Sequence, residues 1–189
     1  MIFVVDTSSS IAVLATIDGA SRSEMQFPAR SQALRHALRQ IAKEGDVSRV
    51  AVATGPGSFT GLRVGVSFGL GLAIGLGVPI VPLPTLDLQA ARSDQPVTAV
   101  VEAGRGRYYF EPPGGEVRLG EPADIPRSHF LVGRIENREP LTAAGYVFED
   151  ESRLRPFAEA AEMLLRTARE VPYRNLKIEY MQSFPAARK

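Results

Sequence analysis

VAVATGPGSFTGLRVG, residues 50–65, followed by an apolar run to Gly77, predicts a strand, a tight turn and a long helix. Residues 50–53 are small or β-branched, and Gly55-Pro56-Gly57 ends the strand with residues suited to sharp turns. Either Ser58 or Thr60 is the expected N-cap of the helix. The turn also offers backbone N–H groups at a helix N-terminus, which favour an anion such as phosphate. Its GxGxxxG spacing matches neither of the nucleotide-binding motifs GxxxxGK[ST] and GxGxxG. The alternative is that these glycines only let the helix start close to a sheet.

The predicted helix, residues 59–76, is apolar around nearly its whole circumference. Steps of four residues place Gly61, Gly65, Gly69 and Ala73 on one strip, along which another backbone can approach closely. Such a helix is normally buried on all sides, and one sheet covers only one side. A second layer of the same domain or a helix of another subunit is therefore expected to cover the rest. The side chains expected at a subunit interface are those of Phe59, Leu62, Val66, Phe68, Leu70, Leu72, Leu34 and Leu38. A membrane span is not expected, because Arg63 and three nearby prolines interrupt the roughly 20 apolar residues that a bilayer needs.

Composition is that of a soluble globular protein: 189 residues, 44% hydrophobic and 23% charged, with a net charge of +1. The absence of cysteine excludes disulfides and thiolate metal sites. The start lacks the basic and long apolar regions of a signal peptide, so a cytoplasmic location is expected. The net charge argues neither for nor against nucleic acid. Local arginine clusters, at residues 30–39, 105–107 and 166–174, are typical of a solvated face.

Hydrophobic periodicity divides the chain into two predicted lobes. In residues 1–92 we expect strands at 2–5, 11–17 and 23–27, the first helix at 31–44, the strand and helix described above, a strand at 78–81 and a helix at 85–91. This βββαβα order predicts a mixed sheet with helices against it, and Asp18-Gly19 predicts a hairpin. Residues 93–189 are expected to form a shorter, less regular lobe with strands at 97–101, 107–111, 117–119, 130–132 and 143–144 and a helix at 157–170.

The chain offers few groups for catalysis. His36 and His129 are its only histidines, neither at a metal-binding spacing, and no GxSxG or SxxK motif is present. We therefore predict no catalytic residue, no metal ligand and no intrinsic turnover. Asp6 and Glu102, each at a strand end, are the carboxylates that an ATP-handling cleft would need, although Asp6 could equally cap its own turn. Weak nucleotide binding is expected at Asp6, Thr7, Ser8, Gly55, Gly57 and Ser58.

Residues 55–65 resemble the GPGSFTGLR signature of the TsaB (YeaZ) family, after an Asp6-Thr7-Ser8 start of the family's type. Residues 105–109 and 172–175 resemble its second-lobe hairpin and its C-terminal end. The chain departs from the family at Arg30-Ser31, where a histidine followed by serine or threonine often stands. The resemblance implies the actin-like ATPase, sugar kinase and Hsp70 (ASKHA, RNase H-like) α/β fold, with two small lobes of which the second is reduced.

The resemblance also implies a function in making N6-threonylcarbamoyladenosine at position 37 of tRNAs that read ANN codons. It implies a non-catalytic partner that binds and supports a TsaD-like paralogue, which carries the transfer chemistry, with a TsaE-like ATPase as a further member of the complex. Homodimerisation through the same helix face is expected when the chain is alone. Contact with tRNA would be indirect, and ATP or ADP would bind weakly or at the partner interface. The alternatives are an independent ATPase or phosphotransferase of the same fold, or a glycopeptidase-like enzyme.

Overall fold

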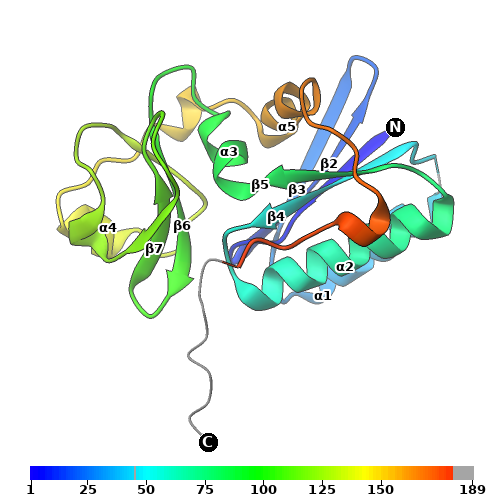
Figure 1. Ribbon diagram of the computed structural model, residues 1–189, viewed down its shortest axis with the longest axis horizontal. Coiled ribbons are helices and arrows are strands. Elements are labelled where there is room, and N and C mark those ends of the chain that lie inside the picture. The colour runs from blue at the N-terminus through cyan, green and yellow to red at the C-terminus, as the bar shows by residue number, and fades with distance from the viewer. Residues whose placement is uncertain (45, 181–189) are drawn as a thin grey trace, which may run out of the picture.

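Two mixed sheets lie side by side in the computed structural model, which describes residues 1–44 and 46–180 (Figure 1). The five-stranded sheet has the order β3-β2-β1-β4-β5 and the four-stranded sheet the order β8-β7-β6-β9. The strands are β1 (Ile2–Asp6), β2 (Ile11–Asp18), β3 (Ser21–Pro28), β4 (Arg49–Gly55), β5 (Ile80–Pro84), β6 (Thr98–Gly104), β7 (Arg107–Glu111), β8 (Arg118–Gly120) and β9 (Leu131–Val132). The helices are α1 (Gln32–Glu44), α2 (Phe59–Leu76), α3 (Thr85–Ala90), α4 (Glu139–Ala143) and α5 (Phe157–Leu165), with 3₁₀ turns at Pro122–Asp124, Glu151–Arg153 and Tyr173–Asn175.

The five-stranded sheet follows the predicted order. β1, β2 and β3 form an antiparallel meander, and the predicted Asp18-Gly19 turn joins β2 to β3 with Gly19 at a φ of 57°. β4 pairs in parallel with β1 and β5, as helical crossovers require. Alternate residues of each strand face opposite sides of a sheet, and here both sides are buried. Phe3 and Val5 belong to the core that contacts α1 and α2, whereas Val4 belongs to the core beneath α5.

α2 begins and ends where the sequence predicts. Ser58 is the N-cap, and its Oγ accepts a hydrogen bond from the Gly61 N–H at 3.3 Å. Gly77, in the left-handed region at a φ of 67°, caps the C-terminal end. The small-residue strip faces the helix's own sheet: a Cβ at Gly69 would lie 2.2 Å from Val52 Cγ1. The glycines therefore allow α2 to approach β4 closely.

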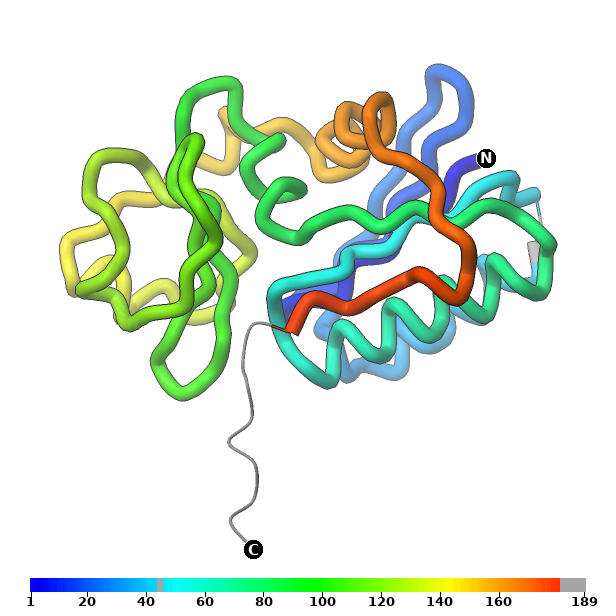
Figure 2. The backbone as a smooth tube through the Cα atoms, viewed as in Figure 1, coloured from blue at the N-terminus to red at the C-terminus, as the bar shows by residue number. Residues whose placement is uncertain are grey.

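The C-terminal part of the chain covers a flank of α2. Residues 171–180 run beside the helix and back toward the sheet (Figures 1 and 2). The Tyr173 hydroxyl lies 2.8 Å from the Val78 carbonyl oxygen and 3.1 Å from that of Ala73, and the Glu179 N–H donates to the Thr54 carbonyl at 2.8 Å. The division at residue 92 remains a prediction about domains. The packing differs from it in one respect, because α5 and residues 171–178 pack on the five-stranded sheet.

The four-stranded sheet is built on the β6–β7 hairpin. Its core includes Val100, Phe110, Leu131 and Tyr146. The strand expected at 143–144 is wrong: these residues end α4, because the N–H of Ala144 closes the last helical turn onto Pro140. The final helix is also shorter than predicted and ends at Leu165.

By length and composition alone, α2 is apolar enough to cross a membrane. Core helices of soluble proteins pass the same test, and one third of the apolar window of α2 is buried inside this fold. Its buried face packs on β1 and β4, with Arg63 exposed on the other side.

Candidate functional site

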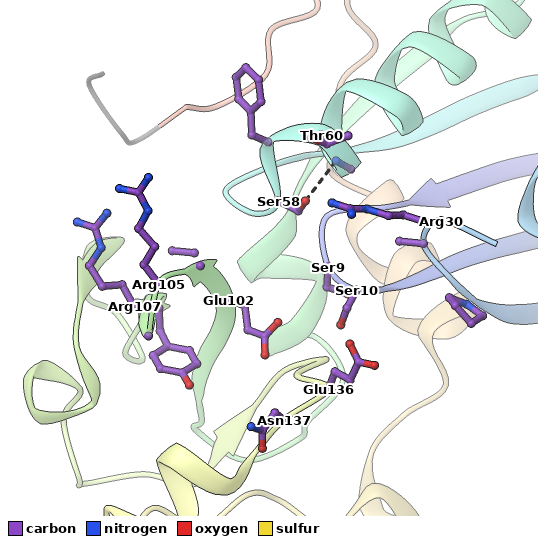
Figure 3. A pocket seen from close by; sticks show the side chains of 18 of the residues that line it. Ser9, Ser10, Arg30, Ser58, Thr60, Glu102, Arg105, Arg107, Glu136 and Asn137 are labelled. Atoms are coloured by element: carbon purple, nitrogen blue, oxygen red, sulfur yellow. Dashed lines mark hydrogen bonds between the residues drawn. The ribbon is translucent and has the colours of Figure 1, made fainter. Parts of the chain in front are cut away.

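A hollow of about 780 Å³ lies between the two sheets (Figure 3). On the side of the five-stranded sheet it is lined by the β1–β2 turn, the end of β3 and the first turn of α2. The other side is formed by the β6–β7 hairpin and by residues 136–140. Clefts of this size between packed units are the usual location of ligand sites.

Two carboxylates extend into this hollow, Glu102 from β6 and Glu136 from the loop after β9 (Figure 3). Burial raises the pKa of Glu102 above its ordinary value, the Asn137 backbone N–H opposes that shift by donating to the carboxylate, and the negative charge of Glu136 adds to it. Neighbouring carboxylates repel phosphate and favour hydrogen-bond donors or cations. Glu102 was predicted as a strand-end carboxylate, whereas no sequence pattern pointed to Glu136.

Replacing Glu102 with glutamine is expected to raise the melting temperature at pH 7 more than at pH 4. The folded state holds the Glu102 proton more tightly than the unfolded chain, so the ionised carboxylate destabilises the fold above its raised pKa. As the pH falls through the raised pKa of the folded state and then below the ordinary pKa of 4.5, the carboxylate is protonated and the destabilisation disappears. Glutamine keeps an acceptor for Asn137 and removes the charge. Glu116→Gln, on an exposed loop, changes the net charge equally and serves as the control. An equal response of both variants would contradict the assignment.

The residues expected to bind a nucleotide phosphate lie together, but their polar groups bond to one another. Ser8 N–H donates to Asp6 Oδ1 at 2.8 Å, and the Thr7 hydroxyl donates to the Gly61 carbonyl at 2.7 Å. Ser58 N–H donates to the Ser8 carbonyl at 2.6 Å. All three residues from Asp6 to Ser8 are buried. Of the six expected residues, only Ser58 lines the hollow.

The glycines of the turn have packing roles. A Cβ at Gly57 would lie 2.5 Å from the Ser8 carbonyl oxygen, so no side chain fits there. Gly55, at a φ of 116°, donates its N–H to Thr85 Oγ1 at 3.1 Å and lies against Glu179. This geometry corresponds to the alternative in which the glycines let α2 start close to the sheet. Nucleotide binding at this turn stays a prediction.

The structure corrects the expected interface on α2. Five of the expected side chains lie in the core of this chain instead of on its surface: Leu62, Val66, Leu72, Leu34 and Leu38. Leu62, Val66 and Leu72 are buried because the glycine strip of α2 faces the sheet and takes the neighbouring rows with it. Leu34 and Leu38 belong to α1 and are buried in the core on the same face of the sheet. Phe59 is partly exposed, and Phe68 and Leu70 are half-buried.

The exposed side of α2 is a different row of residues, which we call the outward stripe: Val64, Ser67, Gly71, Ile74 and Gly75. Val64 is 45% exposed and Ile74 is 54% exposed, which is unusual for two apolar side chains on one helix face. At Gly71 and Gly75 an added Cβ would meet no atom within 4 Å. Sequence reasoning missed the outward stripe. Had the glycine strip been placed against the sheet, the outward stripe would have been located on the opposite side of α2.

Two buried arginines at the junction of the sheets have no sequence signal. Arg134 is 7% exposed, and its guanidinium lies 4.6 Å from the centre of the Phe157 ring. Burial lowers the Arg134 pKa to about 10, although the charge of Asp6 opposes the shift. Arg92 forms an ion pair with Glu151 at 2.7 Å. Together they connect the loop after β9, the end of α3 and the start of α5.

Comparison with known proteins gives a consistent result. A family model described as "TsaD: tRNA N6-adenosine threonylcarbamoyltransferase" matches residues 27–126. The protein named "tRNA threonylcarbamoyladenosine biosynthesis protein TsaB" from Bacillus subtilis is 39% identical over 67 residues, which are 34% of this chain and 29% of that protein. The protein of the same name from Escherichia coli is 34% identical over 70 residues, 34% of this chain and 30% of that protein. The matched part thus spans less than a third of each of these two relatives.

Among solved structures, YeaZ from Pseudomonas aeruginosa superposes with a TM-score of 0.67 at 19% identity, over 95% of this chain and 99% of that one. A second Pseudomonas aeruginosa structure, of an uncharacterized protein with similarity to peptidase YeaZ, gives 0.69 at 20% identity, over 96% and 99%. These likenesses show the fold: a mixed α/β architecture of the RNase H-like, ASKHA type.

Proposed function

Because this chain belongs to the TsaB (YeaZ) family, within the wider family of the TsaD model, we propose that it takes part in making N6-threonylcarbamoyladenosine at position 37 of tRNAs that read ANN codons. Its role in this proposal is that of a non-catalytic partner, which binds and supports a TsaD-like catalytic subunit. The names of the Bacillus subtilis and Escherichia coli relatives support the pathway. The outward stripe of α2 supports the partner role.

The outward stripe has the properties of a helix-docking surface. Exposed glycine costs a helix about 1 kcal/mol relative to alanine, so Gly71 and Gly75 are unfavourable for the isolated helix. Both would allow a partner helix to approach the α2 backbone closely, with Val64 and Ile74 as apolar contacts on either side of Gly71. α1 lies beside α2 on the same face of the sheet and would complete a shared helical bundle (Figure 1).

The remaining parts of the proposal follow from this surface. In isolation the chain would pair with itself through the same stripe, so that homodimer and heterodimer exclude each other. A TsaE-like ATPase would join the complex, ATP or ADP would bind weakly or at the partner interface, and the complex would act in the cytoplasm. The two sheets would correspond to the two lobes of the ASKHA fold, the second of them reduced.

Reconstitution tests this function. The purified chain, a TsaD-like protein and the two together are incubated with tRNA and an activated threonylcarbamoyl donor, and the modified nucleoside is measured by mass spectrometry. We expect no product from this chain alone and at least tenfold more product from the pair than from the TsaD-like protein alone. Product from this chain alone would contradict the non-catalytic role. Partner-independent ATP hydrolysis would favour the alternative of an independent ATPase.

A further inference from the structure

Three arginines surround the mouth of the hollow, and we call them the arginine rim: Arg30, Arg105 and Arg107. Arg30 follows β3 on one side, and the other two belong to the β6–β7 hairpin on the opposite side (Figure 3). Within residues 1–44 and 46–180, no carboxylate forms an ion pair with any of the three. Arginines elsewhere, such as Arg22 and Arg138, do form such pairs. The rim therefore presents three uncompensated positive charges to one opening.

The hairpin holds Arg105 in a strained backbone conformation. Gly104, Arg105 and Gly106 have φ angles of 80°, 56° and 71°. Arg105 is the one non-glycine with a positive φ in the part of the chain that the structure describes. Glycine or asparagine would adopt this conformation more easily than a long side chain. Folding alone thus does not explain an arginine at the hairpin tip, and strained residues are concentrated at functional sites.

An aromatic pair stands at the same opening. Phe59 lines the hollow, and its ring centre lies 5.2 Å from that of Tyr180. Arg63 donates from Nε to the Tyr180 hydroxyl at 3.2 Å, and its guanidinium carbon lies 3.9 Å from the centre of the Phe59 ring. Both aromatic side chains remain more than a third exposed. Exposed aromatics beside arginines are the platform on which unpaired bases stack.

The charge arrangement decides which ligand fits. Phosphate would be repelled inside the hollow by Glu102 and Glu136, but it would be attracted at the rim. Bases have exocyclic amines that can donate to carboxylates, so bases are suited to the interior and backbone phosphates to the rim. Nucleotides with unpaired bases offer both groups in this order, and a single strand offers several of them in succession along the rim.

We propose that this chain binds single-stranded RNA directly, with the phosphates on the arginine rim and the bases at Phe59, Tyr180 and the interior of the hollow. The inference rests on the proposed function, which supplies RNA as the substrate class, and it extends that function from indirect to direct contact. It does not depend on the outward stripe or on a TsaD-like partner.

The test is fluorescence anisotropy with a labelled 12-nucleotide single-stranded RNA of mixed sequence, at 50 and 200 mM KCl, using the whole chain without a partner. The variant Arg30→Gln/Arg105→Gln/Arg107→Gln should bind at least tenfold more weakly at 50 mM. Each lost phosphate contact lowers the slope of log affinity against log salt by about 0.7, so the slope should fall by about 2. The control Arg118→Gln/Arg166→Gln/Arg169→Gln removes the same charge from exposed positions outside the rim and should change affinity less than twofold.

Circular dichroism must show that both triple variants are folded. The single variant Arg30→Gln, on an exposed loop, provides a second measurement, and its affinity for RNA should fall about threefold. Equal weakening by the rim and control variants would mean unspecific attraction and would overturn the proposal. So would the absence of RNA binding by the unaltered chain, or rim-dependent binding to phosphatidylserine vesicles in place of RNA. If reconstitution fails but RNA binding depends on the rim, the proposed partner role is refuted and this inference stands. If reconstitution succeeds but RNA binding does not depend on the rim, only this inference is refuted.

Discussion

Replacing Gly61 with alanine is expected to lower the free energy of unfolding by about 3 kcal/mol, whereas the same replacement at Gly71 should raise it by about 0.5–1 kcal/mol. Both glycines lie in α2, so the helix propensity of alanine favours both variants equally. The difference lies in what the new methyl group meets. At Gly61 it would lie 2.0 Å from the Thr7 carbonyl oxygen, and at Gly71 it would meet no atom within 4 Å.

The cost at Gly61 is high because its neighbour is backbone. Thr7 lies in the turn after β1, and its hydroxyl already donates to the Gly61 carbonyl, so helix and turn cannot separate without losing that bond. Gly65 gives an intermediate case: its methyl group would meet the Thr7 Oγ1 atom at 2.2 Å, and a side-chain atom can rotate away. The expected order of stability is therefore Gly71→Ala, the unaltered chain, Gly65→Ala and Gly61→Ala.

Urea unfolding followed by circular dichroism measures these differences in the free energy of unfolding. The slope of that free energy against urea concentration shows whether the unfolding transition itself has changed. Equal stabilities of Gly61→Ala and Gly71→Ala would mean that α2 does not pack on the β1–β2 turn through its glycine strip. The same result would favour the phosphate-binding interpretation of residues 55–58, because the turn would then be free to accept a ligand.

Local signals explain which parts of the fold could be predicted. The cap at Ser58 and the Asp18-Gly19 turn each act over a few residues, and the structure confirms both predictions. The orientation of α2 could not be predicted from hydrophobic periodicity, because a helix that is apolar nearly all round has no preferred side. Its close-packed side is set by the glycine strip, a steric feature that hydrophobicity does not measure.

Contacts between distant residues explain most of what was missed. The Tyr173 hydroxyl reaches carbonyl oxygens about a hundred residues earlier in the chain, and no periodicity in residues 171–180 announces that pairing. The buried Arg134 likewise packs against Phe157, which lies in another element, and no local pattern announces that contact. At the hollow, Glu102 was predicted because it ends a strand, but Glu136 lies in an irregular loop. For Asp6 the sequence left two roles open, and its carboxylate accepts a hydrogen bond from its own turn, as the capping alternative predicts.

Replacing Ile74 with glutamate is expected to weaken both self-association and binding to a TsaD-like partner by at least tenfold while the chain stays folded. Ile74 is exposed in the isolated chain, so a charge there costs the fold little. In an assembled helical bundle the same side chain would be buried, and burying an isoleucine is worth roughly 1.5–3 kcal/mol, or about one to two powers of ten in affinity. Val64→Glu should behave in the same way.

Two matched variants make the Ile74 result decisive. Val66→Glu lies on the buried side of α2 and should unfold the chain, because Val66 belongs to the core against the sheet. Met163→Glu introduces the same charge at an equally exposed apolar position on α5, on the opposite face of the sheet, and should leave association unchanged. Circular dichroism measures folding, and sedimentation and titration calorimetry measure the two associations. If Ile74→Glu and Val64→Glu bind like Met163→Glu, the outward stripe is not the interface, because a charge cannot be buried among apolar side chains without this loss.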